Sequence, residues 1–383
     1  PDQGKKLSLN DDFSKITGVE DPNILLYPVN GYSDSTFLKQ IIKHEKPDAV
    51  MIFTDPRYFS WLFAIENKIR KEIPIIYLNI WDDYHAPLYN KEFYESCDLL
   101  FGISKQTVNI NNIVLGDKAA DKIIEYLPHG LDHTNYKPSS EYSEDENKDL
   151  ENVKKHFFGD DEVDFCLFFN SRNIRRKQIP DAILAFKHFL DQLPKEKAKK
   201  CLLIMHTDPT DQHGQDLVAI MNSLGATDNR ILLSDEKVPP EALAQMYNIA
   251  DCTINISDAE GFGLATLESL SSGVPIIVNM TGGLQEQVTD GEEWFGIGLE
   301  PASKTIIGSQ EVPYIYEDRL NREDFLAALR KMYNMSEEDR QKLGLKGREH
   351  VIKNYNFVDF EKKWIELMDK VHEKYGSWEN RKE

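Results

Sequence analysis

The chain has 383 residues, of which 40% are hydrophobic and 29% charged, so it is long enough for two globular domains and is not disordered by composition. A formal net charge of −20 argues against nucleic acid as a partner, and no apolar run approaches the roughly 18 residues of a membrane span. The four cysteines lie far apart without a paired or histidine-rich pattern, which predicts reduced thiols, no metal site and a cytoplasmic location.

Short, almost continuously apolar runs in the first part of the chain are typical of parallel strands covered on both faces. These runs are 23–27, 49–53, 73–78 and 99–103. We interpret residues 1–135 as an N-terminal Rossmann-like domain on the acceptor side. The next residues, 136–152, have many charges and few apolar side chains, which predicts an acidic linker or an exposed excursion.

Strand-like runs alternate with helical patterns again beyond this acidic segment. The apolar runs are 163–169, 201–205, 230–233, 252–256 and 275–278, and the helical patterns include 181–190 and 240–249. The alternation predicts an α/β fold with a second doubly wound domain over 153–355, whose ligand lies at the carboxyl ends of the strands. The remaining segment, 356–383, begins with a strongly helical pattern from Phe357 to Tyr375.

The most informative motif is Glu260-Gly-Phe-Gly-Leu-Ala-Thr-Leu-Glu268, which follows the strand-like run 252–256. It predicts a strand, a glycine-rich turn and a helix over 264–271, an arrangement that binds phosphate through free backbone N–H groups and the helix dipole. Eight residues are a little over two helical turns, so the two carboxylates should lie on about the same face. Acceptor groups on both sides of a phosphate site suit a sugar nucleotide. The alternative is a helix cap and a solvated carboxylate, because such a spacing often arises by chance.

A second motif places Arg172 and Lys177 five residues apart, between the strand-like run 163–169 and the helical pattern 181–190. A guanidinium makes forked hydrogen bonds and an ammonium acts as a point charge, so the two cations are suited to bracket a diphosphate. A solvated basic turn is the alternative interpretation of the same residues.

The segments 250–263 and 273–286 resemble the donor-binding signature of GT-B glycosyltransferases, most closely the large retaining group called family 4. The likeness is close over these segments and weaker over the rest of the chain from Pro47 onward. It implies two Rossmann-like, doubly wound domains that face each other across a cleft. It also implies that the C-terminal helix, within 356–383, crosses back to the first domain.

The activity implied by this resemblance is a glycosyltransferase that moves a sugar from a UDP-, GDP- or ADP-linked donor to a hydroxyl of a carbohydrate, lipid or protein. Anomeric configuration would be retained by front-face attack, without a metal or other cofactor. The alternatives are a non-catalytic sugar-nucleotide-binding protein or partner subunit, and a sugar-nucleotide 2-epimerase. A phosphorylase with pyridoxal phosphate ranks lowest, because no lysine has a convincing Schiff-base context.

Roles for individual residues follow from the same resemblance. Arg172 and Lys177 would hold the donor diphosphate and stabilise it as it leaves. Glu260 would bind hydroxyls of the transferred sugar, and Glu268 would bind the ribose hydroxyls. The phosphates would also accept hydrogen bonds from backbone N–H groups at the glycine-rich turn, those of Phe262, Gly263 and Leu264.

The sequence departs from the family pattern at Ser171 and Gln178, where glycine is common. The resemblance therefore does not predict the backbone path of this loop. Gly282 and Gly283 either approach the donor sugar or phosphates, or form a simple tight turn. Backbone groups near Val238 are expected to bind the base.

The first domain offers weaker candidates. The family often places a histidine near the sugar, and His85 is the candidate here, with Asp82 or Asp83 as the alternative and a surface loop as the functionless interpretation. His129, just before the second domain, is expected to be structural. The segment before Asn23 lacks an apolar first strand with a Gly-rich loop, so we expect part of the usual first domain to be absent, replaced or cleaved.

Overall fold

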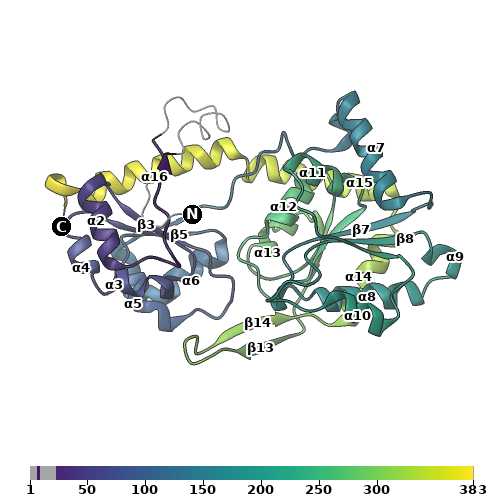
Figure 1. Ribbon diagram of the computed structural model, residues 1–383, viewed down its shortest axis with the longest axis horizontal. Helices are drawn as coiled ribbons and strands as arrows, with labels where there is room; N and C mark the ends of the chain where they lie inside the picture. The colour runs from purple at the N-terminus through teal and green to yellow at the C-terminus, as the bar shows by residue number, and fades with distance from the viewer. Residues whose placement is uncertain (1–6, 9–22, 383) are drawn as a thin grey trace.

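The computed structural model describes residues 7–8 and 23–382 of the chain. These residues form two α/β domains that lie side by side, each built around a parallel sheet with helices on its faces (Figure 1). The expected α/β class with two Rossmann-like domains is therefore confirmed.

The sheet of the N-terminal domain is parallel and has the strand order β3-β4-β5-β6. Its strands are β3 (Val50–Phe53), β4 (Ile75–Asn79), β5 (Leu99–Gly102) and β6 (Ile123–Tyr126). The helices of this domain are α2 (Ser35–Glu45), α3 (Ser60–Phe63), α4 (Glu66–Ile69), α5 (Lys91–Glu95) and α6 (Lys105–Leu115). Polar side chains begin two of them, since Asp34 caps α2 and Ser104 caps α6.

The strand expected at 23–27 does not join this sheet. Its central part, β2 (Leu25–Leu26), pairs instead with β1 (Leu7–Ser8) in a separate antiparallel ribbon. Residues 9–22, where the rest of the usual first strand and loop would be sought, lie outside the described residues.

The sheet of the C-terminal domain is also parallel, with the order β12-β11-β10-β7-β8-β9. The strands are β7 (Phe165–Asn170), β8 (Cys201–His206), β9 (Ile231–Ser234), β10 (Cys252–Asn255), β11 (Ile276–Asn279) and β12 (Gly296–Leu299). The helices that follow or flank them are α8 (Ile179–Asp191), α9 (Lys195–Ala198), α10 (Leu217–Leu224), α11 (Pro240–Asn248), α12 (Leu264–Ser271), α13 (Leu284–Val288), α14 (Arg322–Asn334) and α15 (Glu337–Asn354). Apolar clusters cover both faces of this sheet, which explains why its strands are almost continuously hydrophobic.

Shorter 3₁₀ turns complete the chain. They are η1 (Pro56–Phe59), η2 (Leu88–Asn90), η3 (Gly116–Asp121), η4 (Ser139–Glu141), η5 (Arg175–Lys177) and η6 (Trp378–Asn380).

The segment 136–152, expected to be an acidic linker or an exposed excursion, includes the beginning of helix α7 (Glu144–Phe158). Ser143 and Glu146 form a capping box at its start, and acidic side chains in the first turn interact favourably with the helix dipole. Leu150 is buried in one of the clusters of the C-terminal domain. One apolar contact surface and a strong N-terminal cap therefore suffice to order a highly charged segment.

The C-terminal helix α16 (Phe357–Tyr375) crosses from the second domain back to the first, as expected (Figure 1). Leu367 and Val371 are buried in a cluster with Phe101 and other residues of the N-terminal sheet. The ring of Trp364 stacks on Phe101 with a centroid distance of 5.3 Å. Burial of a large apolar side chain contributes about 1.5–3 kcal/mol, so this helix ties the two domains together.

An antiparallel hairpin was not expected from the sequence. Strands β13 (Ser303–Ile307) and β14 (Ile315–Arg319) pair with each other and extend from the C-terminal domain toward the N-terminal domain (Figure 1). Tyr314, beside the start of β14, contacts the N-terminal domain, so the two domains are joined at the hairpin as well as through α16.

The described residues include all four cysteines of the chain. The cysteines are all free and buried, as predicted: Cys97, Cys166, Cys201 and Cys252. No described helix is both long enough and apolar enough to cross a membrane. Within residues 7–8 and 23–382, His, Cys, Asp and Glu side chains form no group of three or more that could hold a metal ion.

Candidate functional site

A cavity of about 430 Å³ lies between the two domains. The N-terminal domain contributes Phe53, Ile80, Asp82 and Ile103, and the connecting segment contributes His129. The C-terminal domain contributes Asn170, Arg176, Lys177, Leu243, Asn255, Glu260, Gly261, Phe262, Gly263, Leu264, Ala265 and Glu268. Several of these residues end a parallel strand or directly follow one, so the cavity lies where ligands of doubly wound sheets bind.

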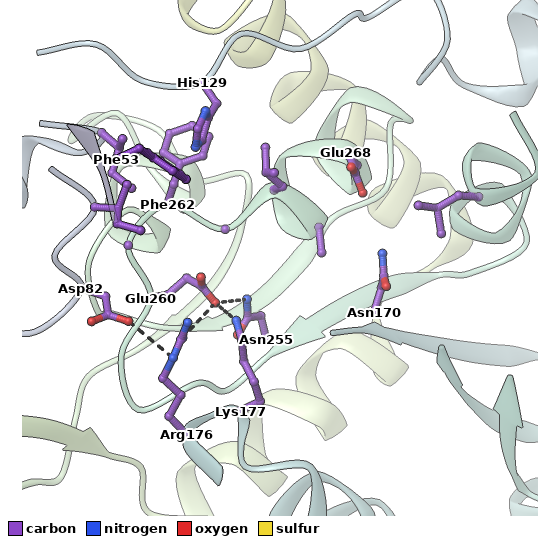
Figure 2. A pocket seen from close by; sticks show the side chains of 17 residues that line it. Phe53, Asp82, His129, Asn170, Arg176, Lys177, Asn255, Glu260, Phe262 and Glu268 are labelled. Atoms are coloured by element: carbon purple, nitrogen blue, oxygen red, sulfur yellow. Dashed lines mark hydrogen bonds and ion pairs between the residues drawn. The ribbon is translucent and has the colours of Figure 1, made fainter. Parts of the chain in front are cut away.

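Glu260 is the central charged group of this cavity (Figure 2). Its carboxylate pairs with the ammonium of Lys177, and its Oε2 lies 3.8 Å from Nη1 of Arg176. Asn255 and Ser257 lie 3.5 and 3.4 Å from the same oxygen and donate to it. Burial alone would raise the pKa of Glu260, but Lys177 and Arg176 outweigh it and lower this pKa below its ordinary value. Glu260 is therefore ionised at neutral pH.

The beginning of α12 forms the adjacent wall of the cavity. Gly263 precedes the helix with a φ of 96°, and no side chain caps the helix there among the described residues. Gly263, Leu264 and Ala265 line the cavity. An uncapped helix N-terminus presents backbone N–H groups and a partial positive charge, which favours an anion beside Lys177.

Gly282 and Gly283 support this turn from behind rather than line the cavity. The N–H of Gly283 donates to the carbonyl of Glu260 at 3.1 Å. A Cβ on residue 282, whose φ is 49°, would lie 1.7 Å from that same carbonyl oxygen. These glycines therefore allow two backbone segments to approach closely.

Glu268 lies apart from Glu260, on the side of the cavity where Asn170 lies (Figure 2). The hydroxyl of Tyr247 donates to its Oε2 at 2.7 Å, and Asn170 Nδ2 donates to that hydroxyl at 2.9 Å. Burial raises the pKa of Glu268 to about 7, although hydrogen bonds from Tyr247 and Tyr136 oppose the rise. Sequence reasoning missed Asn170 and Tyr247. The end of a strand-like run was the available signal for Asn170, whereas Tyr247 lies inside helix α11 and had no such signal.

The basic turn brings Lys177 to the cavity, as the motif suggested, but not Arg172. Arg172 lies outside the cavity, where its exposed guanidinium pairs with Asp211 at 2.7 Å. The η5 turn carries Arg176 to the cavity instead, with its Nε 3.4 Å from Asp82 Oδ2. Gln178 has a φ of 54°, in the left-handed region that glycine adopts easily, at a position where glycine is common in the family.

The three candidates of the first domain, Asp82, Asp83 and His85, differ in whether they face the cavity. Asp82 lines the cavity, whereas His85 is exposed outside it, with its ring 4.5 Å from that of Tyr316. Asp83 is buried behind the loop, and burial together with the Asp82 carboxylate raises the pKa of Asp83 to about 10. Asp82 is therefore the acidic group of this loop that faces the cavity.

Two further candidates, His129 and Val238, pack against apolar side chains. His129 lines the cavity, but its ring packs edge-on against Phe262 at 5.1 Å, and burial lowers the pKa of His129. Val238 does not line the cavity and packs against the core of the C-terminal domain. The cavity-lining residue nearest to it in the sequence is Leu243.

Comparison with known proteins gives one family match. The family model described as glycosyl transferases group 1 matches residues 151–350, which is just over half of the chain. A D-inositol 3-phosphate glycosyltransferase of Acidothermus cellulolyticus is 31% identical over 144 residues, 37% of this chain and 32% of that protein. An N-acetyl-alpha-D-glucosaminyl L-malate synthase of Bacillus anthracis is 23% identical over 175 residues, 46% and 42% of the two chains. The chain thus matches less than half the length of these curated relatives.

Solved structures show the same fold at lower identity. HepE of Anabaena, in complex with UDP and glucose, has a TM-score of 0.64 and 15% identity, covering 87% of this chain and 81% of that one. Sucrose-phosphate synthase of Thermosynechococcus elongatus has a TM-score of 0.64 and 18% identity, covering 87% and 76%. At this identity the likeness concerns the fold of both domains.

Proposed function

The chain belongs to the glycosyl transferases of group 1, and we propose that it transfers a sugar from a nucleoside-diphosphate sugar to an acceptor hydroxyl with retention of configuration. The observation that carries the proposal is the interdomain cavity. It combines the uncapped start of α12, the cations Arg176 and Lys177, and two carboxylates on separate sides, Glu260 and Glu268.

The donor is oriented in the cavity by charge. Its diphosphate lies at the α12 N-terminus beside Lys177, the transferred sugar lies toward Glu260, and the ribose hydroxyls donate to Glu268. HepE of Anabaena has been crystallised with UDP and glucose and with UDP-glucose, which makes UDP-glucose the first donor to test.

The chemical step follows from where charge develops. As the bond between the anomeric carbon and the diphosphate oxygen breaks, negative charge grows on the phosphates and positive charge on the anomeric carbon. Lys177, Arg176 and the N–H groups at the α12 start stabilise the leaving diphosphate, so we propose that no metal is needed. The acceptor oxygen attacks the same face, and its proton passes to the departing phosphate oxygen.

The first domain supplies the acceptor side of this cavity. We assign the first-domain sugar contact to Asp82 instead of His85, because Asp82 lines the cavity.

The proposal is tested by calorimetry and by slow hydrolysis of UDP-, GDP- and ADP-sugars in the presence of a chelator. We expect one donor to bind, to release nucleotide slowly, and to bind at least tenfold more weakly to Glu268→Ala, in line with the loss of charged hydrogen bonds. Tight binding without release of nucleotide, even over days, would favour a sugar-nucleotide-binding protein instead. Absence of binding to all three donor classes contradicts the proposal.

Arg172 provides a separate prediction. If its guanidinium leaves Asp211 for the diphosphate, Arg172→Ala lowers donor affinity by about tenfold. Asp211→Asn then raises affinity by up to about fivefold, because an exposed ion pair that competes with the donor has been removed. Titration calorimetry of both variants with UDP-glucose checks this. Unchanged affinity in both would leave Arg176 and Lys177 as the cations that hold the donor.

A further inference from the structure

The β13–β14 hairpin is fixed at its base to the loops that carry the donor-binding charges. Arg175, two residues before Lys177, donates to Glu317 at 2.7 Å. The backbone N–H of Asp318 donates to the carbonyl of Asp258, two residues before Glu260, at 2.8 Å. The base of the hairpin therefore moves with the part of the site that is proposed to bind the donor.

A second set of contacts strengthens this attachment. Thr281 donates to a carboxylate oxygen of Asp318 at 2.8 Å, and Asn279 donates to its carbonyl at 2.9 Å. Arg319 pairs with Asp258 at 3.0 Å. Glu317, Asp318 and Asp258 are all buried, so the hairpin base is attached through buried carboxylates.

The other end of the hairpin holds the loop of the first domain that carries Asp82. Tyr314 is the centre of this contact. Its hydroxyl accepts from the N–H of Leu88 at 3.1 Å and lies 3.3 Å from the carbonyl of Ala86, to which it donates. The hydroxyl of Tyr89 donates to the carbonyl of Tyr314 at 2.9 Å, and the two rings pack edge to face at 4.9 Å.

Further contacts join the hairpin to the same loop and to the η1 turn. Lys304 donates to the carbonyl of Tyr84 at 3.4 Å, and Tyr316 packs against the ring of His85. Arg57 donates to the carbonyl of Glu311 at the hairpin tip at 3.2 Å. The β13–β14 hairpin of the second domain thus contacts residues 84–89. These residues follow Ile80 and Asp82, which line the cavity.

We propose that the β13–β14 hairpin positions the 80–89 loop against the donor-binding domain, and that Tyr314 is its main positioning residue. The hairpin links the loops of Lys177 and Glu260 at its base to the loop of Asp82 at its other end. It thereby fixes the distance between the donor and the first-domain wall of the cavity. The catalytic part of this proposal rests on the proposed sugar transfer, whereas the structural part does not.

The first experiment measures hydrogen–deuterium exchange in the full chain without ligand. Tyr314→Phe removes both hydrogen bonds of the hydroxyl and keeps the ring. We expect amides in 82–89 to exchange about tenfold faster, because these bonds hold the loop closed. Tyr316→Phe is the matched control, since no hydrogen bond of its hydroxyl occurs in the described part of the chain, and it should leave exchange unchanged. Tyr89→Phe, which removes the bond from the loop side, should act in the same direction as Tyr314→Phe.

The second experiment measures hydrolysis of UDP-glucose by the same variants. Tyr314→Phe is expected to lower kcat about tenfold and to leave KM within twofold, because the donor-binding residues are untouched while the facing loop is displaced. Equal behaviour of Tyr314→Phe and Tyr316→Phe in exchange would overturn the positioning role. Faster exchange with an unchanged kcat would overturn its catalytic part. If the wild type binds no donor, the proposed function fails, and the exchange experiment still decides whether the hairpin holds the loop.

Discussion

Lys177→Met is expected to reduce turnover of the donor by about a hundredfold or more, which is the effect of removing one preorganised group that stabilises developing charge. The Lys177 side chain is 11% exposed and pairs with Glu260 inside the cavity. Methionine keeps the length of the apolar stem and removes only the charge, so the loss reports on electrostatics. The measurement is the rate of UDP-glucose hydrolysis, with donor affinity from calorimetry.

The same substitution also lowers stability, because it leaves the buried Glu260 carboxylate with Arg176 as its remaining cation at a longer distance. Removing one partner of a buried ion pair costs roughly 3–5 kcal/mol. The double variant Lys177→Met with Glu260→Gln should therefore recover much of the lost Tm while staying inactive. Recovery of activity in the double variant would contradict a direct role of Lys177 at the diphosphate.

Donor affinity is expected to rise about tenfold between pH 6 and pH 8. Burial holds the pKa of Glu268 at about 7, so only a small fraction of the free protein has the carboxylate that ribose hydroxyls need at pH 6. Apparent affinity scales with the fraction of the protein in the competent state. UDP-glucose is the ligand of choice for this titration, because its diphosphate is esterified at both ends and does not titrate in this range.

Glu268→Gln is the control for this titration. The affinity of this variant for UDP-glucose should be lower and should not change from pH 6 to pH 8. Burial raises the pKa of Asp258 to about 7 as well, and because Asp258 is still present in the variant, a constant affinity separates the two groups. The pH dependence of the free energy of unfolding tests the raised pKa of Glu268 independently of donor binding. A raised folded-state pKa stabilises the protein fully below the unfolded pKa, and this stabilisation is lost as pH rises through 7. At pH 8 the glutamine variant should therefore have the higher Tm, and an identical pH profile of affinity in both proteins would refute the role of Glu268.

Local sequence signals located much of the site. The glycine-rich turn and the helix over 264–271 appear with the expected bounds, because positive φ at Gly263 and the apolar pattern of α12 are properties of the segment itself. Glu260 and Lys177 reach the cavity because residues that follow parallel strands gather at one edge of the sheet, and Glu268 lines it from helix α12.

Side-chain direction at the other positions depends on neighbours that are distant in sequence. The sequence pattern does not distinguish Arg172 from Arg176 as the arginine that faces the cavity. In the folded chain Arg172 pairs with Asp211 outside the cavity, whereas Arg176 pairs with Asp82 inside it. The choice between Asp82 and His85 likewise depends on packing against Tyr316 of the other domain.

The α/β class, the family resemblance and the location of the turns that we propose bind the donor could be predicted from the sequence, because periodicity, glycine positions and charge spacing are local. Only the folded chain shows that Tyr247 hydrogen-bonds Glu268 and that the hairpin holds residues 84–89. These features are contacts between segments far apart in the chain, and their energies depend on burial and geometry that arise only when both domains are folded.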